Sequence, residues 1–271
     1  MPAVDLFRLR LQVAQLIELF SQPEGFLRQF HDLLGLYNQW TLREGMQTTP
    51  KTLMRSYNAP LQVIRQIELG IKPVILSEPH AALNLADLLW QDNFLESREM
   101  AAYILGQIPI MHIEDVKSRI LDWANPNLDS AALDALFNKA TSRLLTERPE
   151  IWEGIMENFL SHYEPIFQSY GLKAITGVIK NPDFNQVPSL FKLLRPFIQS
   201  PQSETIINLT KAVAALAERT PIETVYFLKQ ILAVTQGPEV EQFIRRCLPY
   251  FPLDLQRNLQ EALRSHAKRI Y

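Results

Sequence analysis

The sequence predicts an all-α protein in which pairs of helices are stacked in series to form a solenoid. Apolar residues recur three and four positions apart along most of the chain, which is the periodicity of amphipathic helices. No segment shows the sustained apolar and polar alternation, bounded by turn residues, that indicates a β-strand. In addition, two proline-containing corners in the second half each end one helix and begin another within a few residues. Short corners of this kind are expected between antiparallel neighbours.

The two corners have similar chemistry. Residues 180–184 read Lys-Asn-Pro-Asp-Phe and precede an apolar-periodic run from Val187, whereas residues 217–221 read Ala-Glu-Arg-Thr-Pro and precede a run from Glu223. Proline is tolerated in the first turn of a helix because its missing N–H would have no partner there. Because stacked helix pairs create a long concave surface, the pattern favours recognition of a macromolecule.

The N-terminal part is predicted to hold two helices and an irregular connector. The first helix runs from about Val4 to Phe20, and a second follows the break at residues 21–25. Residues 39–59 have little apolar pattern, so we expect a long loop, with or without one short helix at 50–56. We therefore divide the chain into an N-terminal helical cap with its connector, residues 1–59, and a repeat domain, residues 60–271.

From Pro60 onward the helices follow one another closely. They are predicted near residues 60–77, 79–91, 95–107, 112–124, 129–147, 149–161, 164–179, 185–199, 202–219, 221–235, 238–249 and 252–269. Several begin at an N-cap residue or a leading proline, among them Asp129, Pro149, Pro221 and Pro252. The pairs recur at about 35–40 residues, which is within the range of HEAT-like repeats.

Composition is that of an ordinary soluble globular protein, with 47% apolar and 21% charged residues. The 9 glycines are few for a Gly-rich nucleotide loop. Because the net charge is −2, binding of nucleic acid requires the 27 Lys and Arg residues to be concentrated on one face. The C-terminus is locally basic, through Arg257, Arg264, Lys268 and Arg269. This basic stretch is either part of such a face or a solvated helix surface.

The compartment is expected to be the cytoplasm. The single cysteine, Cys247, excludes an internal disulfide and lies in an apolar stretch, where we expect it to be a small buried hydrophobe. No apolar run reaches the roughly 18 residues that a membrane span needs. The first 20 residues carry Asp5, Arg8, Arg10 and Glu18, which a signal peptide would not.

The motifs that define common enzyme classes are absent. The chain has no Walker A sequence, no G-x-G-x-x-G, no H-E-x-x-H and no G-x-S-x-G. No two of its five histidines share a helical turn, which excludes a helix-borne pair of metal ligands. We expect no metal site and no cofactor.

Asp134 is the candidate catalytic residue. It lies among apolar residues in the segment Ala131–Phe137, in a helix that Asp129 is expected to cap. A short acidic side chain is poor for helix propensity there. Partial burial or a position facing a cleft would raise its pKa and suit a functional role, whereas an exposed position would make it an ordinary helix residue.

Lys211 is the first candidate for binding phosphates, because its helix is otherwise small and apolar. With Lys173 on an earlier helix, and Arg245 and Arg246 on a later one, it could line a concave basic strip. The alternative is that these are scattered, solvated cations. Two groups of aromatic residues suit either core packing or base stacking: Trp90, Trp123 and Trp152, and Tyr163, Phe167 and Tyr170.

The chain from about Leu85 to Leu259 resembles the HEAT-repeat DNA alkylation repair proteins, the AlkD-like alkylpurine DNA glycosylases. The resemblance lies in residues 88–90, 97–105, 130–136, 170–192, 211–221 and 245–252. It implies a C-shaped α–α superhelix whose positively charged concave groove holds duplex DNA. It also implies excision of alkylated purines by cleavage of the N-glycosidic bond, with an aspartate that stabilises positive charge on the sugar.

The family's site is matched only in part. Asp134 falls where the family has its aspartate, but Ser130 stands where a tryptophan is expected four residues earlier. Ser169 stands in place of the arginine and Lys211 in place of the second tryptophan. Tyr170 is a candidate for the lost aromatic role, and Lys173 or Lys211 for a phosphate contact.

Two functions therefore follow from the sequence. The first is a monomeric DNA-binding protein of the alkylation-repair type, with Asp134 catalysing excision and with Tyr170, Lys173, Lys211, Arg245 and Arg246 contacting DNA. The alternative is a non-catalytic HEAT-repeat scaffold that binds nucleic acid or a protein partner, because a fold does not determine a function. Whether the chain is an enzyme stays open at this point, since one carboxylate supplies charge stabilisation but not the missing aromatic walls.

Overall fold

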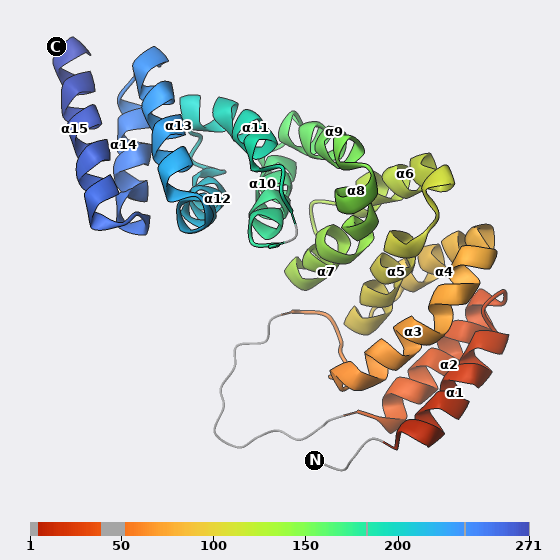
Figure 1. Cartoon of the computed structure of the whole chain (residues 1–271). Coiled ribbons are helices and arrows are strands. Elements are labelled where there is room, and N and C mark those ends of the chain that lie inside the picture. Colours follow the sequence, from red (N-terminus) through yellow and green to blue (C-terminus); the bar gives the residue numbers. More distant parts are fainter. Residues whose placement is uncertain (1–4, 39–51, 183, 236, 271) are drawn as a thin grey trace. The chain divides into compact units, whose positions relative to one another are not determined.

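The computed structural model describes residues 5–38, 52–182, 184–235 and 237–270, with only the backbone described for residues 267–270 (Figure 1). Within these residues the regular elements are all helical, and the one β contact is an isolated bridge between Arg55 and Phe94. The prediction of an all-α protein is therefore confirmed. The chain divides into two compact units, Met1–Glu147 and Arg148–Tyr271, which are described separately.

The first unit contains two sets of helices that pack on each other. Its elements are α1 (Leu6–Glu18), α2 (Pro23–Leu36), α3 (Leu61–Ser77), α4 (Pro79–Gln91), α5 (Leu95–Gln107), η1 (Ile110–His112), α6 (Ile113–Trp123), α7 (Ser130–Ala135), η2 (Leu136–Ala140) and α8 (Ser142–Glu147). Helix α1 contacts α3, α3 contacts α5, and α5 contacts α7 and η2. Helix α2 contacts α4, and α6 is joined to α4 by a bidentate Arg119–Asp87 pair.

The helix predicted over residues 129–147 is interrupted. Its middle is η2, a π-turn in which Thr141 Oγ1 donates a hydrogen bond to the carbonyl oxygen of Phe137 at 2.5 Å. Ser142 Oγ likewise donates to the carbonyl oxygen of Lys139 at 2.8 Å. Hydroxyl groups that bond to a preceding carbonyl compete with the helical ladder, which is the physical reason for the interruption.

The described part of the connector lies against the start of α5 and α7. The backbone N–H of Leu95 donates to the carbonyl oxygen of Arg55 at 2.9 Å, and Ser56 Oγ donates to Glu96 Oε1 at 2.8 Å. The backbone N–H of Leu53 donates to the carboxylate of Asp129 at 3.0 Å. No helix forms over residues 52–56, so the short helix considered there is not found, and residues 50 and 51 lie outside the described residues.

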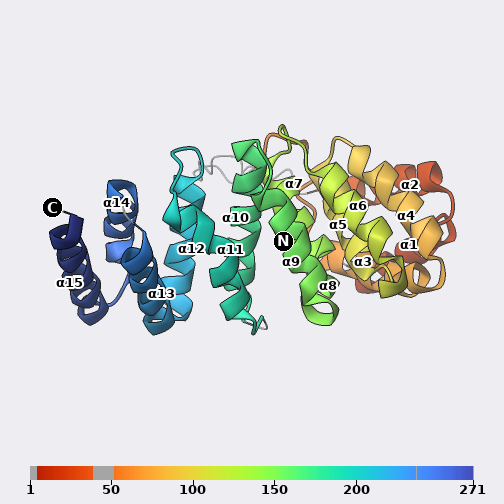
Figure 2. The same ribbon diagram turned by 90° about the horizontal axis from the view of Figure 1, so that it is seen from above.

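The second unit also consists of two sets of helices. They are α9 (Pro149–Leu160), α10 (Pro165–Ile179), α11 (Val187–Gln199), α12 (Ile206–Arg219), α13 (Pro221–Val234), α14 (Pro238–Cys247), η3 (Leu248–Tyr250) and α15 (Leu253–Ile270). Helices α10, α12 and α14 contact one another in order, and so do α9, α11, α13 and α15 (Figures 1 and 2). Because consecutive helices belong to different sets, the second unit has two layers.

The predicted helix bounds agree with the structure to within a few residues, with one larger difference. The helix expected from residue 202 begins at Ile206, because residues 203–205 form a turn that includes the buried Thr205. The boundary predicted between residues 59 and 60 stays a prediction, although α1 and α2 pack directly on α3 and α4.

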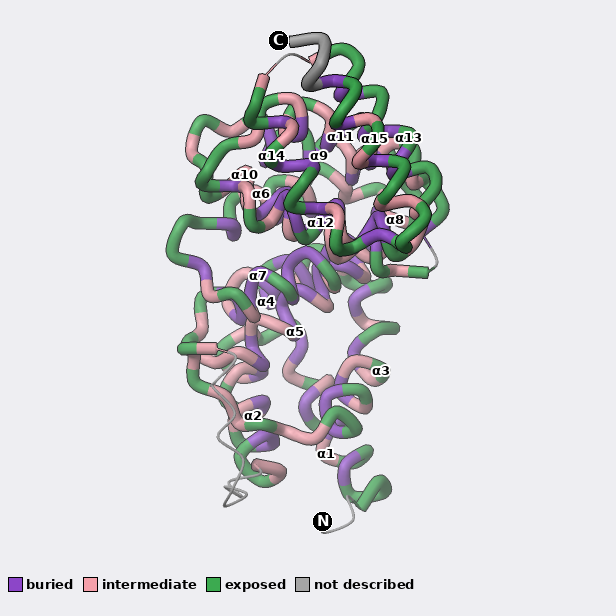
Figure 3. The backbone as a smooth tube through the Cα atoms, turned by 90° about the vertical axis from the view of Figure 1, so that its left-hand side faces the viewer, coloured by how far each residue is buried: buried purple, intermediate pink, exposed green. Residues whose placement is uncertain are grey.

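Each layer buries one face of its helices against the other layer. Figure 3 shows buried and exposed stretches alternating along the helices, as amphipathic periodicity requires. Fully buried aromatic side chains fill the centre of each unit, among them Phe26 and Phe30 in the first and Trp152 and Phe243 in the second. None of the helices within the described ranges combines the length and the apolar character needed to cross a membrane.

Candidate nucleic-acid interface

The second unit presents cations on the outer side of one helix layer. Helices α10, α12 and α14 contact α9, α11 and α13 on their buried sides, so their exposed residues face away from the other layer. We call the outward cations of this layer, Lys173, Lys180, Lys211, Arg245 and Arg246, the basic face. It contains all four of the cations predicted from the sequence, together with Lys180.

Helix α10 contributes two lysines and no carboxylate between Pro165 and Lys180. Lys173 is half-buried and Lys180, the C-cap residue, is exposed. The two are seven positions apart, so they lie on the same side of the helix, two turns from each other. A cation at the last turn is also favoured by the negative end of the helix dipole.

Helix α12 places Lys211 at the centre of the basic face. Its neighbours Ala212 and Val213 are fully buried, whereas Lys211 is exposed. Glu218, two turns later on the same outward stripe, is also exposed, so this helix carries one charge of each sign on that side. The sequence predicts that Lys211 points to solvent or to a groove, and its exposure agrees with that prediction.

Helix α14 adds Arg245 and Arg246. The Arg245 guanidinium lies 3.7 Å from the carboxylate of Glu241 one turn earlier, in a pair whose arginine side chain is exposed and whose glutamate side chain is mostly buried. Arg246 is exposed. Burial raises the pKa of the neighbouring Cys247 thiol, and the positive charge of Arg246 opposes that rise. Lys268 and Arg269, from the basic C-terminus, have side chains outside the described residues.

Tyr170 belongs to the core of the second unit. Its side chain is only 6% exposed, and its ring makes an edge contact with Phe167 at 5.9 Å between centroids. This burial favours packing over stacking on a base. Tyr163, which precedes α10 and belongs to the same group of aromatic residues, is 83% exposed, and its ring stacks on His162.

Asp134 is an exposed residue of α7, so it lies in the first unit, while the basic face lies in the second. Ser130 and Asn138, four residues before and after it, are exposed as well. The six residues of α7 end where the π-turn η2 begins, directly after Asp134 and Ala135. Single π-turns occur often at functional sites, but by themselves they define no chemistry.

Trp90 and Trp123 of the first unit are used for packing. Trp90 and Trp123 stack in parallel with ring centroids 4.6 Å apart, and both are buried. The Arg98 guanidinium lies over Trp90 at 5.6 Å and donates from Nε to the carbonyl oxygen of Asp92. Burial lowers the pKa of Arg98, although the charges of Asp129 and Asp92 oppose that change. Packing between helices, one of the two roles considered, is thus the one observed.

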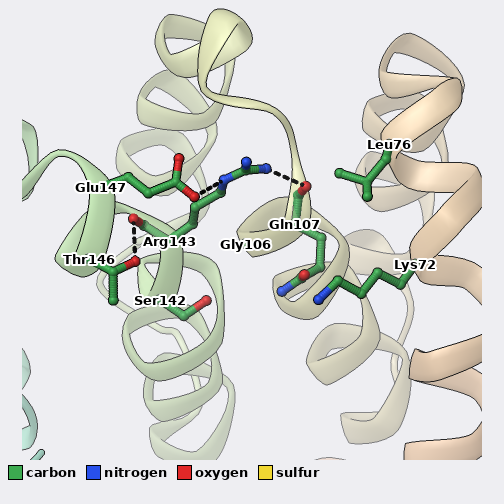
Figure 4. A pocket seen from close by; sticks show the side chains of 8 residues that line it. All are labelled: Lys72, Leu76, Gly106, Gln107, Ser142, Arg143, Thr146 and Glu147. Carbon is green, nitrogen blue, oxygen red and sulfur yellow. Dashed lines mark hydrogen bonds and ion pairs between the residues drawn. The ribbon is translucent and has the colours of Figure 1, made fainter. Parts of the chain in front are cut away.

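A hollow of about 320 Å³ in the first unit is bordered by cationic and hydroxyl side chains (Figure 4). The Arg143 guanidinium beside this hollow already bonds to other groups of the protein. Its Nη1 donates to the carbonyl oxygens of Gln107 and Ile108 at 3.3 Å, and its Nε pairs with Glu147 at 2.6 Å. These contacts satisfy the carbonyls at the C-terminal end of α5, so we assign the arginine a structural role.

Two cations of the second unit were missed by sequence reasoning. Lys180 could have been found, since it stands two helical turns after Lys173. Arg219 could not, because its role depends on a corner 35–40 residues away: its guanidinium donates to the carbonyl oxygens of Ile179, Asn181 and Phe184. Arg219 thereby holds the first of the two proline corners, residues 180–184, in place. Its guanidinium is occupied by these contacts within the protein.

Comparison with known proteins gives no assignment. No protein-family model matches the chain, and no curated protein sequence matches it significantly.

Proposed function

We propose that this protein is a helical-repeat scaffold of HEAT type that binds the phosphate backbone of duplex DNA through the basic face. The observation that carries the proposal is the placement of Lys180, Lys211 and Arg246 as exposed cations on three consecutive helices of one layer. Successive cations along a layer suit a regular polyanion, because each neutralised phosphate releases a counterion. No base-reading element is needed for such binding.

The opposite layer of the second unit supports the choice of face. Its first helix, α9, carries Glu150, Glu153 and Glu157 and no cation, so it would repel a phosphate backbone. Helix α10, by contrast, has lysines and no carboxylate. The difference in charge between α9 and α10 favours the face that α10 presents, although α11 and α13 of the opposite layer carry the exposed Lys192 and Lys229 and the net charge of the chain is −2.

Excision of alkylated bases is the second part of the proposal, and Asp134 carries it. Asp134 is exposed, the position expected of an ordinary helix residue, so this part rests on the family resemblance and on the ability of a carboxylate to stabilise the positive charge that develops on the sugar as the glycosidic bond breaks. The buried Trp90, Trp123 and Tyr170 supply no aromatic wall for a lesion. We therefore expect DNA binding to be the principal function and any excision to be slow.

The test is binding of a fluorescent duplex by anisotropy over a range of salt concentrations. We expect Lys180→Glu combined with Lys211→Glu to weaken binding by about tenfold or more and to flatten the dependence of affinity on salt, by about 0.9 in the logarithmic slope for each phosphate that is no longer neutralised. The matched control is Lys192→Glu combined with Lys229→Glu, which reverses two exposed lysines on α11 and α13. Equal weakening in both double variants, or no salt-dependent binding by the wild type, would refute the proposal.

The excision experiment uses methylated duplex DNA and measures release of free methylpurine. We expect release by the wild type to fall by at least about tenfold in Asp134→Asn, since the amide keeps the shape of the side chain and removes its charge. Equal release by the two proteins would exclude Asp134 as the catalytic residue. An absence of release by the wild type would leave the scaffold as a non-catalytic binding protein.

A further inference from the structure

The outer side of the other layer of the second unit carries an apolar groove between α11 and α13. The groove has a volume of about 420 Å³ and is lined by Pro188, Phe191, Arg195, Ile222, Glu223, Tyr226, Phe227 and Gln230. We call these eight residues the α11–α13 groove. They come from two neighbouring helices of one layer, so none of them belongs to the basic face.

Large apolar side chains are exposed at the groove. Ile222 is 70% exposed and Tyr226 is 66% exposed, one helical turn apart on α13. The floor is aromatic: the rings of Phe191 and Phe227 lie 4.7 Å apart, and Phe227 is buried. Exposed aromatic and aliphatic residues that converge on a hollow mark an interaction surface better than scattered single ones do.

Arg195 provides a charged group inside this apolar surface. Its guanidinium lies over the Phe227 ring at 5.4 Å and reaches Gln230 Oε1 at 3.5 Å, a long contact with a neutral partner. Among the described residues no carboxylate pairs with it. An arginine held over an aromatic ring, with donors left for a carboxylate, is a typical anchor of a protein interface.

The charges around the groove are mainly positive. Lys192 and Lys229 are exposed on the same two helices, and Glu223 is the one carboxylate that lines the groove. Lys192 lies 3.6 Å from Glu157 in an exposed pair, which screens its charge only weakly. The surface therefore complements a partner that is apolar on one side and acidic at its edges.

We propose that the α11–α13 groove is a docking site for an acidic amphipathic helix of a partner protein. The apolar face of such a helix would cover Ile222, Tyr226 and the aromatic floor, and a carboxylate would pair with Arg195. A nucleic acid fits less well, because the floor offers apolar area and a single arginine instead of a track of cations. The proposal is independent of DNA binding by the basic face.

The probe is a fluorescein-labelled synthetic helix of about 18 residues, with leucines three and four positions apart and glutamates beside them. A second probe replaces each glutamate with lysine. We expect the acidic probe to bind the wild-type chain at least about tenfold more tightly than the basic probe, because only the acidic one complements Arg195. Equal affinity for the two probes would overturn the proposal.

Two variants of the full chain locate the binding site. Tyr226→Ser and Arg195→Glu are each expected to weaken binding of the acidic probe by about tenfold, and Arg195→Glu should improve binding of the basic probe. The matched controls are Tyr163→Ser, which removes an exposed tyrosine at another corner, and Arg257→Glu, which reverses an exposed cation on α15. These should bind the acidic probe like the wild type, with unchanged circular dichroism in all four variants.

Other occupants give distinct results. A concentration-dependent dimer in sedimentation that disappears in Tyr226→Ser would assign the groove to a second copy of this chain and overturn the proposal. Loss of duplex DNA binding in Tyr226→Ser would assign it to nucleic acid, with the same consequence. Full affinity for the acidic probe in both groove variants would also overturn it.

Discussion

Gly106, in the last turn of α5, faces the backbone carbonyl oxygen of Lys139 so closely that a methyl group on Gly106 would overlap that oxygen. Lys139 belongs to the π-turn η2, so the contact joins the end of α5 to the interruption between α7 and α8. Ser142 Oγ also donates to the same carbonyl. The missing side chain at Gly106 thus lets α5 and η2 pack backbone against backbone.

Replacement of Gly106 by alanine should therefore destabilise the protein, although alanine has the higher helix propensity. We expect the free energy of unfolding to fall by about 2–4 kcal/mol, because the overlapping partner is backbone and cannot rotate away. Gly154 is the matched control: it lies within α9, is exposed and has no atom near its added methyl group. Gly154→Ala should raise stability by up to about 1 kcal/mol. Urea unfolding gives the change in the free energy of unfolding for both variants. A Gly106→Ala protein as stable as the wild type would contradict the close contact with the Lys139 carbonyl oxygen.

Replacement of Arg219 by methionine should open the corner after α10. The change leaves the carbonyl oxygens of Ile179, Asn181 and Phe184 without their guanidinium donor, and we expect a decrease in stability of about 2–3 kcal/mol. Arg246→Met, on the exposed side of α14, is the control and should stay within about 0.5 kcal/mol of the wild type. Thermal unfolding followed by circular dichroism distinguishes the two, and similar melting temperatures would count against the role of Arg219.

Replacement of Asp129 by alanine should weaken the start of α7 in a pH-dependent way. Burial of Asp129 opposes its ionisation, but hydrogen bonds from the backbone N–H groups of Leu53 and Ala131 and from the Thr52 side chain outweigh it, so its pKa lies below the ordinary value. A carboxyl group with a lowered pKa stabilises the fold above its unfolded pKa of about 4, and this stabilisation is lost as the pH falls through the folded pKa.

The expected decrease in stability for Asp129→Ala is about 1 kcal/mol at pH 7, the usual cost of removing an N-cap residue. The difference from the wild type should shrink as the pH is lowered below about 4, because the wild-type carboxyl group then protonates. Asp122→Ala, at the exposed end of α6, should change stability little at pH 7. Urea unfolding at about pH 3 to 7 is the measurement, and a pH-independent difference would exclude the ionised cap.

Cys247 should be unreactive in the folded protein. Burial raises the pKa of its thiol to about 12, against the opposing charge of Arg246, and the side chain is fully buried. Because only the thiolate is nucleophilic, almost none reacts near neutral pH. We expect no reaction with a disulfide reagent in buffer and one thiol per chain in denaturant. Rapid labelling of the native protein would show that α14 opens readily and would contradict the burial of this thiol.

Much of the helical structure was determined by the sequence alone. Apolar spacing of three and four residues, together with prolines at Pro149, Pro221 and Pro252, was sufficient to predict most helices to within a few residues. This is possible because a helix forms from local contacts and its start depends on a nearby residue such as Asp129. The exposure of Lys211 was likewise predictable, since its buried neighbours define which side of the helix faces the other layer.

Only the tertiary structure decided which of these residues are buried in the core and which are exposed for binding. From the sequence, Tyr170 and Trp90 suited either core packing or base stacking, and their burial is set by helices distant in the sequence. The capture of Arg219 by carbonyls of the preceding corner, the π-turn opposite Gly106 and the groove beside Arg195 depend on contacts between separate helices. Helical periodicity indicates which side of a helix is apolar, but it contains no information about the atoms that side will meet.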